Sequence, residues 1–236
     1  MGLYPLSFSK VNLINTCPRA AKWQYVDLRS ATIKSIPFEI GNRVHLILQS
    51  YVDNIKVPKD NLVLSPKLLE GILHFKNKLL TRILNTYPQV YGEARVYLNN
   101  KFKRTDGFLN SSLMGVIDLL CYNNKTEEAT VIDYKSSTYI DEDLILKQAD
   151  FYSIISKECF PKMKHFNYLY YAVPLKKLKS IINTDDLSFI DKNKQNIVSS
   201  IPKLEKDLNQ GTPKPGSFCS ICVYRNGCDE CQALKQ

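Results

Sequence analysis

The sequence has no apolar run long enough to cross a membrane. A membrane-spanning helix needs about 18 to 20 consecutive apolar residues, and no stretch of the 236 residues approaches that length. The N-terminus also lacks the charged segment followed by an apolar segment that is typical of secretory signals. We therefore expect an intracellular, cytoplasmic protein that does not associate with a membrane.

Internal repeats, low-complexity segments and linkers rich in Gly, Ser or Pro are also missing. Their absence excludes repeat arrays and domains joined by flexible linkers. With 44% hydrophobic and 23% charged residues, the chain has the composition of a globular protein and is long enough for one substantial core. We predict a single domain over residues 1–236.

Acidic residues are fewer than basic residues. The chain has 23 Asp and Glu residues against 32 Lys and Arg residues, which gives a net charge of +9. This excess favours a polyanionic partner such as nucleic acid. Basic side chains on solvated faces are common, however, so the charge supports a nucleic-acid partner without establishing one.

Three charged residues interrupt short apolar segments: Asp118 in GVIDLL, and Asp133 and Lys135 in IDYKSS. Side chains alternate faces along a strand, so Asp133 and Lys135 point the same way. The polar stretch 123–128 between the segments predicts a hairpin, which would bring the two carboxylates together. Paired carboxylates suit Mg²⁺ or Mn²⁺, the ions that assist phosphodiester hydrolysis. The alternative for Asp133 and Lys135 is a solvated ion pair on an exposed face.

Four of the seven cysteines lie close together near the C-terminus, in FCSICVYRNGCDEC. An odd total without a secretory signal argues against a disulfide framework, and such clustering is typical of a zinc or iron-sulfur site. Cys121 and Cys159 stand among apolar residues and are expected to be buried as small hydrophobic side chains. The clustered thiols, which could form a local zinc site, are Cys219, Cys222, Cys228 and Cys231.

Hydrophobic periodicity and capping residues predict an α/β protein. Ser9 and Ser65 are the expected N-caps of two of its helices. The predicted helices cover about residues 9–17, 18–26, 38–52, 65–87, 141–157 and 186–210, and the predicted strands cover 90–99, 113–122, 129–136 and 165–173.

The ordered motifs resemble the PD-(D/E)XK nuclease superfamily, and specifically its RecB-like branch. That branch has G-x-x-x-H on a helix, an Asp in a strand, D-x-K in the next strand and Q-x-x-x-Y on the following helix. Here these motifs read Gly41 to His45, Asp118, Asp133 to Lys135, and Gln148 to Tyr152. The resemblance implies an αβββαβ core with a mixed sheet over about 89–210 and an N-terminal helical lobe over about 9–88.

By that resemblance the metal ligands are His45, Asp118, Asp133 and the carbonyl of Tyr134. Lys135 would orient water or neutralise the transition state, Gln148 and Tyr152 would touch DNA, and Glu93 in YGEARV would join the catalytic group. Other readings stay open for three of these residues. His45 could be an ordinary helix residue, Tyr152 a core residue, and Glu93 an exposed cross-strand partner.

Cys17 in NTCPRA extends the resemblance. One N-terminal cysteine with Cys219, Cys222 and Cys228 is similar to the iron-sulfur RecB-like nucleases, which include the AddB nuclease domain and CRISPR-associated exonucleases. This similarity implies a 4Fe-4S cluster joining Cys17 to the tail over about 211–236. Cys231 departs from that pattern, so the local zinc site remains an alternative.

The sequence as a whole therefore predicts a Mg²⁺- or Mn²⁺-dependent DNA nuclease, an exonuclease that acts on single-stranded or duplex ends. Proteins of recombination or CRISPR adaptation are the expected partners besides DNA. A non-catalytic DNA-binding or adaptor protein on the same fold is the competing hypothesis, and intact Asp118, Asp133 and Lys135 speak against it. A zinc-ribbon module on an unrelated body would leave the ordered upstream motifs unexplained.

Overall fold

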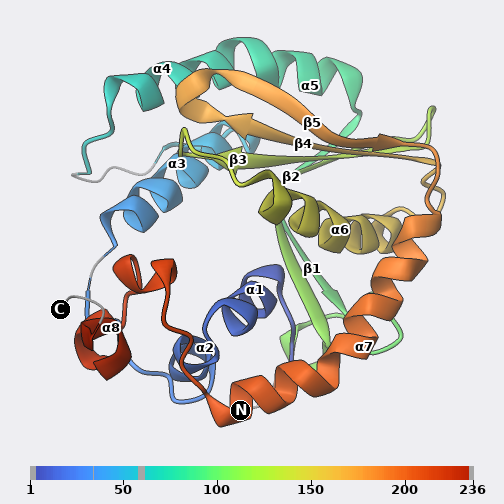
Figure 1. The fold of residues 1–236 in the computed structure, drawn as a ribbon. Helices are drawn as coiled ribbons and strands as arrows, with labels where there is room; N and C mark the ends of the chain where they lie inside the picture. The colour runs from blue at the N-terminus through green and yellow to red at the C-terminus, as the bar shows by residue number, and fades with distance from the viewer. Residues whose placement is uncertain (1–3, 34, 58–61, 234–236) are drawn as a thin grey trace.

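The computed structural model describes residues 4–33, 35–57 and 62–233. Its centre is a five-stranded mixed sheet in the order β1-β2-β3-β4-β5, with helices on both faces (Figure 1). Only β3 and β4 are parallel, and a helix connects them. The strands are β1 (Gln89–Leu98), β2 (Leu113–Asn123), β3 (Glu128–Lys135), β4 (His165–Ala172) and β5 (Lys177–Thr184).

The helices form two groups around this sheet. One face is covered by α3 (Ile36–Val52), α4 (Pro66–His74), the π-helical turn η1 (Phe75–Leu79) and α5 (Leu80–Thr86), and the other by α1 (Phe8–Thr16), α6 (Glu142–Cys159) and α7 (Ser188–Gln210). Next to α1 lies α2 (Pro18–Tyr25), and α8 (Asp229–Ala233) ends the described chain. The short 3₁₀ segments are η2 (Phe108–Asn110), η3 (Val173–Leu175), η4 (Ser217–Ser220) and η5 (Arg225–Gly227).

The expected α/β fold and its αβββαβ order are confirmed, and every predicted strand is present. Two details differ from the prediction. The N-cap of α1 is Ser7 rather than Ser9, and its hydroxyl accepts the backbone N–H of Lys10. Strand β5 was not predicted, because its residues are mostly exposed and rich in lysine, as befits an edge strand. In the described residues, no helix has both the length and the apolar character needed to cross a membrane.

Two clusters of buried side chains fill the two sides of the sheet. The α6 cluster, between the sheet and α1, α6 and α7, includes Ile117 and Leu120. The α4 cluster, between the sheet and α3, α4 and α5, includes Leu119 and Ile132. Ile117 and Leu119 are two residues apart, so a regular strand would place them on the same face. Strand β2 therefore changes faces at Asp118.

The neighbouring strand is irregular at the same level. Gly92 pairs with Leu119 and Ala94 with Ile117, so Glu93 lies opposite Asp118. The backbone φ of Glu93 is +42°, in the left-handed region that L residues seldom adopt. Irregularities of this kind in a sheet re-aim side chains and are frequent next to active sites.

Candidate active site

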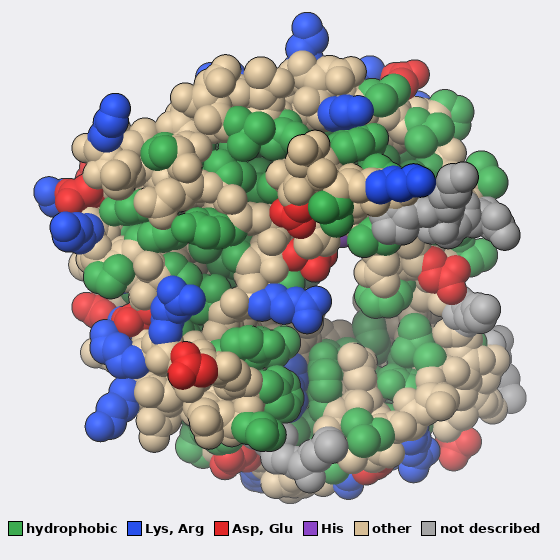
Figure 2. Space-filling model, turned by 180° about the vertical axis from the view of Figure 1, so that it is seen from behind, with side chains coloured by type: hydrophobic (Ala, Val, Ile, Leu, Met, Phe, Trp, Pro, Cys, Tyr) green, Lys and Arg blue, Asp and Glu red, His purple; other side chains and the backbone are tan. Residues whose placement is uncertain are grey.

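A cavity of about 510 Å³ opens where β2 and β3 diverge. Viewed from behind, the molecule is hollowed near its centre, and acidic and basic side chains border the hollow (Figure 2). The cavity is lined by Ser9, Asn42, His45, Glu93, Val116, Asp118, Asp133, Tyr134, Lys135, Ser136, Ser137, Gln148 and Tyr152. All of the residues predicted for the metal and DNA sites thus meet at one place.

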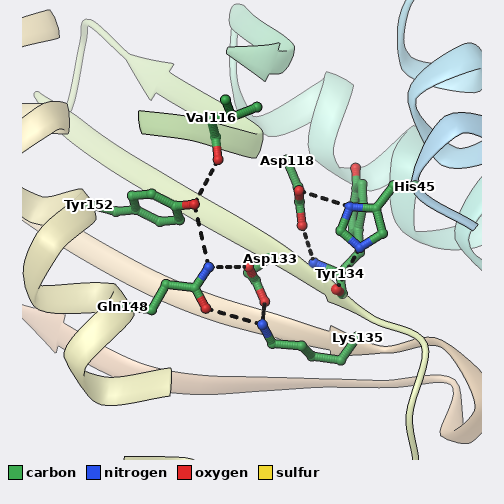
Figure 3. Close-up of polar contacts among 8 residues, drawn as sticks. All are labelled: His45, Val116, Asp118, Asp133, Tyr134, Lys135, Gln148 and Tyr152. Carbon is green, nitrogen blue, oxygen red and sulfur yellow. Dashed lines mark hydrogen bonds and ion pairs between the residues drawn. The ribbon is translucent and has the colours of Figure 1, made fainter. Parts of the chain in front are cut away.

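Asp118 is held by the backbone of the adjacent strand. Pairing between β2 and β3 ends at Leu119 and Ile132, one residue before the two aspartates would face each other. Beyond that point the backbone N–H of Tyr134 donates to Oδ2 of Asp118 at 2.7 Å (Figure 3). The Asp118 carboxylate therefore accepts a hydrogen bond from a backbone N–H that lies beyond the paired part of β2 and β3.

His45 approaches this pair from α3. Its Nδ1 lies 3.0 Å from Oδ1 of Asp118, and its Nε2 lies 3.0 Å from the carbonyl oxygen of Tyr134 (Figure 3). Burial lowers the pKa of His45, but the Asp118 carboxylate, the Asp133 charge and the Tyr134 carbonyl raise it more, so the net pKa is above the ordinary value. Both ring nitrogens face acceptors, and this arrangement favours the imidazolium form.

Asp133 is almost completely buried, with 4% of its surface exposed. Burial raises the pKa of its carboxyl to about 6, Lys135 opposes that shift, and Asp118 adds to it. The ammonium of Lys135 lies 2.5 Å from Oδ2 of Asp133. Burial disfavours the charged form of a carboxylate, and nearby cations favour it. A second positive charge beside Asp133 would therefore stabilise its ionised form further.

Gln148 on α6 connects this ion pair to the helix. Its Nε2 donates to Oδ1 of Asp133 at 2.9 Å, and its Oε1 accepts from Nζ of Lys135 at 3.1 Å (Figure 3). The hydroxyl of Tyr152, one turn later, donates to the carbonyl of Val116 at 2.7 Å. Tyr152 is 8% exposed and packs in the α6 cluster. This placement matches the open alternative that Tyr152 is a core residue, and it leaves little of the ring free to stack on a base.

The donor set suits a hard divalent cation. It offers carboxylate oxygens of Asp118 and Asp133, the Tyr134 carbonyl and the His45 imidazole, the ligand types that Mg²⁺ and Mn²⁺ accept. Oδ2 of Asp133 is buried and has no hydrogen-bond partner within the described residues, since its contact with Lys135 lacks hydrogen-bond geometry. In the described part of the chain no three His, Cys, Asp or Glu side chains are placed so that they could hold one metal ion. In this arrangement His45 contacts Asp118, and Lys135 contacts Asp133.

Four polar residues of the cavity were not predicted: Ser9, Asn42, Ser136 and Ser137. Asn42 lies three positions before His45 on α3, so helical spacing would have placed both on one face. The two serines directly follow Lys135, where the strand ends. Nothing in the local sequence points to Ser9, because its approach depends on how α1 packs.

The cysteines predicted to bind metal also come together. Cys17, Cys219, Cys222, Cys228 and Cys231 are all buried in one cluster against α2. Burial raises the pKa of Cys222, and the nearby thiols of Cys17, Cys228 and Cys219 raise it further. Burial also raises the pKa of Cys231, as do its contacts with Cys219 and Cys228.

The two ends of the chain are tied together by charge as well. Arg19 pairs with Glu230 at 2.5 Å. Of the two cysteines expected in the core, Cys121 is fully buried, whereas Cys159 is only half-buried.

Comparisons with known proteins give two similar solved structures and one matching family. A structure from Eubacterium rectale, of a provisionally assigned exonuclease, aligns with a TM-score of 0.54 and 12% identity over 92% of this chain and 86% of that one. The structure of SSO0001 aligns with a TM-score of 0.43 and 14% identity over 94% and 84%. Curated protein sequences give no match. The family model of the PD-(D/E)XK nuclease superfamily matches residues 5–229, and the chain therefore belongs to that superfamily.

Proposed function

We propose that this protein is a metal-dependent DNA nuclease of the RecB-like branch, an exonuclease that cleaves DNA from an end. One observation carries the proposal. Asp118, Asp133, Lys135 and His45 come from three different elements, yet they line one cavity, in a chain that belongs to the PD-(D/E)XK nuclease superfamily. The nuclease superfamily supplies nucleic acid as the substrate class, and the name of the Eubacterium rectale neighbour supports an exonuclease.

Each residue has a role that follows from its contacts. Asp118, Asp133, His45 and the Tyr134 carbonyl are the proposed metal ligands. A divalent ion held there lowers the pKa of a bound water and stabilises charge on the phosphoryl oxygen. The Asp118 carboxylate is oriented by the Tyr134 N–H, so its position does not depend on a flexible partner.

Lys135 is the proposed cation for the scissile phosphate. Its side chain is 28% exposed, and among the described residues its ammonium contacts Asp133 and Gln148. With a cation held at Asp133, the Lys135 ammonium would be available to a phosphate oxygen. Gln148 then acts as a positioning residue, because it contacts both members of the pair.

Glu93 is the proposed third acidic group. It lines the cavity opposite Asp118 and is held there by the strained turn of β1. A carboxylate at this position increases the negative potential of the cavity and favours divalent over monovalent cations.

A structural 4Fe-4S cluster is the proposed use of the buried thiols. Such a cluster takes one thiolate at each iron, so its ligands need not converge on one ion. Cys17, Cys219, Cys222 and Cys228 supply one thiol from the N-terminal helices and three from the tail, and burial protects them from solvent. The cluster would fix the tail against α2.

The proposal is tested with wild-type protein purified without oxygen. We expect Mn²⁺ or Mg²⁺ to support cleavage of end-labelled linear DNA, EDTA to stop it, and a covalently closed circle to survive. If the closed circle is cut as fast as linear DNA, the enzyme is an endonuclease and the exonuclease assignment fails. If no DNA is cut while the cluster is intact, the protein is a binding or adaptor protein instead.

A further inference from the structure

A second and larger cavity lies along β1, outside the site described above. Its volume is about 940 Å³, within the usual range for ligand sites. One wall is formed by β1 from Gln89 to Val96. The other is formed by the last residue of α6, Cys159, and the chain after it to Lys162. Neither the nuclease chemistry nor the cysteine cluster uses any of these residues.

Aromatic rings form part of this second cavity. Tyr122 and Phe160 stack face to face, with centroids 4.2 Å apart and planes 3° apart. Tyr91 is the third ring of the group. Its centroid lies 6.4 Å from that of Phe160, the two ring planes make an angle of 32°, and Tyr91 is 46% exposed. Tyr122 is buried and Phe160 is partly buried, so Tyr91 is the ring of the three that is most accessible to a ligand. An exposed ring supported from behind by others is a platform for a flat, unsaturated group such as a nucleobase.

Cations surround these rings. Arg95, Arg104 and Lys162 line the cavity with exposed side chains, and Asp53 is the one acidic residue among its lining residues. None of the three cations forms an ion pair with any acidic side chain that the structure describes. Nearby Lys103, by contrast, is paired with Glu158. The second cavity thus keeps a surplus of positive charge, which favours an anionic ligand.

The two cavities meet at Glu93. Its side chain lines the catalytic cavity, while Gly92 and Ala94 on either side of it line the second cavity. Consecutive Cα atoms are about 4 Å apart, so the two cavities adjoin at β1, and a flexible chain can span the distance between them. Of the flexible polyanions, a single-stranded nucleic acid combines the charge with bases that stack.

We propose that the second cavity binds the unpaired strand of the substrate beyond the scissile phosphate, with a base on Tyr91 and phosphates at Arg95 and Arg104. This inference rests on the proposed nuclease function for its substrate. It predicts that residues of the catalytic cavity determine the cleavage rate, whereas residues of the second cavity determine the affinity for the strand.

The test measures binding of a fluorescent single strand of about 20 nucleotides in EDTA, where no cleavage occurs. Removing two phosphate contacts with Arg95→Gln/Arg104→Gln should weaken binding by roughly tenfold or more, and should reduce the slope of log affinity against log salt by about 1.4. Tyr91→Ala should weaken binding by roughly tenfold through lost stacking. The matched controls are Lys203→Gln/Lys206→Gln on α7 and Phe108→Ala, which remove the same types of exposed side chain elsewhere.

Equal affinity of the cavity variants and their controls would overturn the inference, as would wild-type protein that binds no single strand. So would a poly-glutamate peptide that competes as well as DNA of equal charge, because the cavity would then recognise charge alone. Cleavage is measured separately, with Mn²⁺. The cavity variants should raise KM for the long strand and leave kcat near the wild-type value. A wild-type protein that binds the strand through this cavity and cleaves nothing would refute the proposed function but not the strand site.

Discussion

The backbone N–H of Tyr134 donates a hydrogen bond to the Asp118 carboxylate at 2.7 Å, across the point where β2 and β3 stop pairing. Asp118 is therefore held by this backbone group and by His45, whose Nδ1 lies 3.0 Å from its other oxygen. Asp133, on the next strand, is fixed by a charged partner, Lys135, and by the amide of Gln148. The two carboxylates therefore depend on different neighbours, and substitutions at them test different contacts.

Replacing Asp133 by Asn should stabilise the metal-free protein at pH 7. Burial raises the folded-state pKa of Asp133 to about 6, above its ordinary 3.8. The folded state therefore binds more protons than the unfolded state between those values, and stability falls as pH rises through that window. Asn removes this loss, which is on the order of 2 to 3 kcal/mol. Urea unfolding in EDTA at pH 7 measures it.

The same measurement near pH 3.5 serves as its control. Wild-type Asp133 is then protonated, so Asp133→Asn and wild type should differ little. Asp191→Asn on the exposed start of α7 should match wild type at both pH values, because its side chain is 83% exposed. If Asp133→Asn is the less stable protein at pH 7, the charged Asp133–Lys135 pair contributes net stability and the burial argument is wrong.

Iron content distinguishes the two readings of the cysteine cluster. Protein purified without oxygen should be brown and carry about four irons per chain. Cys17→Ser should lose most of the iron, whereas Cys231→Ser and the half-buried Cys159→Ser, which lies outside the cluster, should keep it. One zinc per chain without iron, together with indifference to Cys17→Ser, would support a local zinc site of the four C-terminal thiols.

A stability prediction concerns the packing of α4 on the turn after β4. A Cβ atom added at Gly71 would lie 1.8 Å from the carbonyl oxygen of Val173, so the backbone must move. Gly71→Ala should destabilise the fold by about 2 kcal/mol or more despite the better helix propensity of Ala. Gly107→Ala is the matched control, since a Cβ there meets nothing within 4 Å. Equal melting temperatures of the two variants would contradict this packing.

The strands of the core could be predicted because they depend on local patterns. The gathering of His45 and Gln148 with the two aspartates was expected from the resemblance to the nuclease superfamily. Alternation placed Asp133 and Lys135 on one face, and the structure pairs them. The prediction of one core-facing apolar stripe for the helix over about 65–87 was less exact. That stripe consists of Leu68, Leu69, Ile72, Leu73, Leu79, Leu80, Ile83 and Leu84. Leu68, Leu80 and their buried neighbours face the core, whereas Leu69, Leu73 and Leu84 are about half exposed. A π-helical turn at Phe75–Leu79 shifts the helix face within this stripe.

Features set by tertiary packing could not be predicted in this way. The change of faces at Asp118 occurs opposite Glu93, whose φ lies in the left-handed region. Glutamate as a residue type does not predict that conformation. The burial of Tyr152 depends on its hydroxyl reaching the Val116 carbonyl on another element. Strand β5 lacks the apolar alternation that marks a strand, because its place at the sheet edge needs little burial.

The central claim is that Asp133 and Lys135 act in bond cleavage rather than in holding DNA. The most direct measurement is the rate of DNA cleavage under single-turnover conditions with Mn²⁺, made beside the binding affinity in EDTA. Asp133→Ala and Lys135→Ala should each lower the rate by about a thousandfold or more while changing affinity by less than about tenfold. Asp191→Ala should behave as wild type. Variants that cleave at the wild-type rate, or that lose affinity and rate in equal measure, would contradict the account.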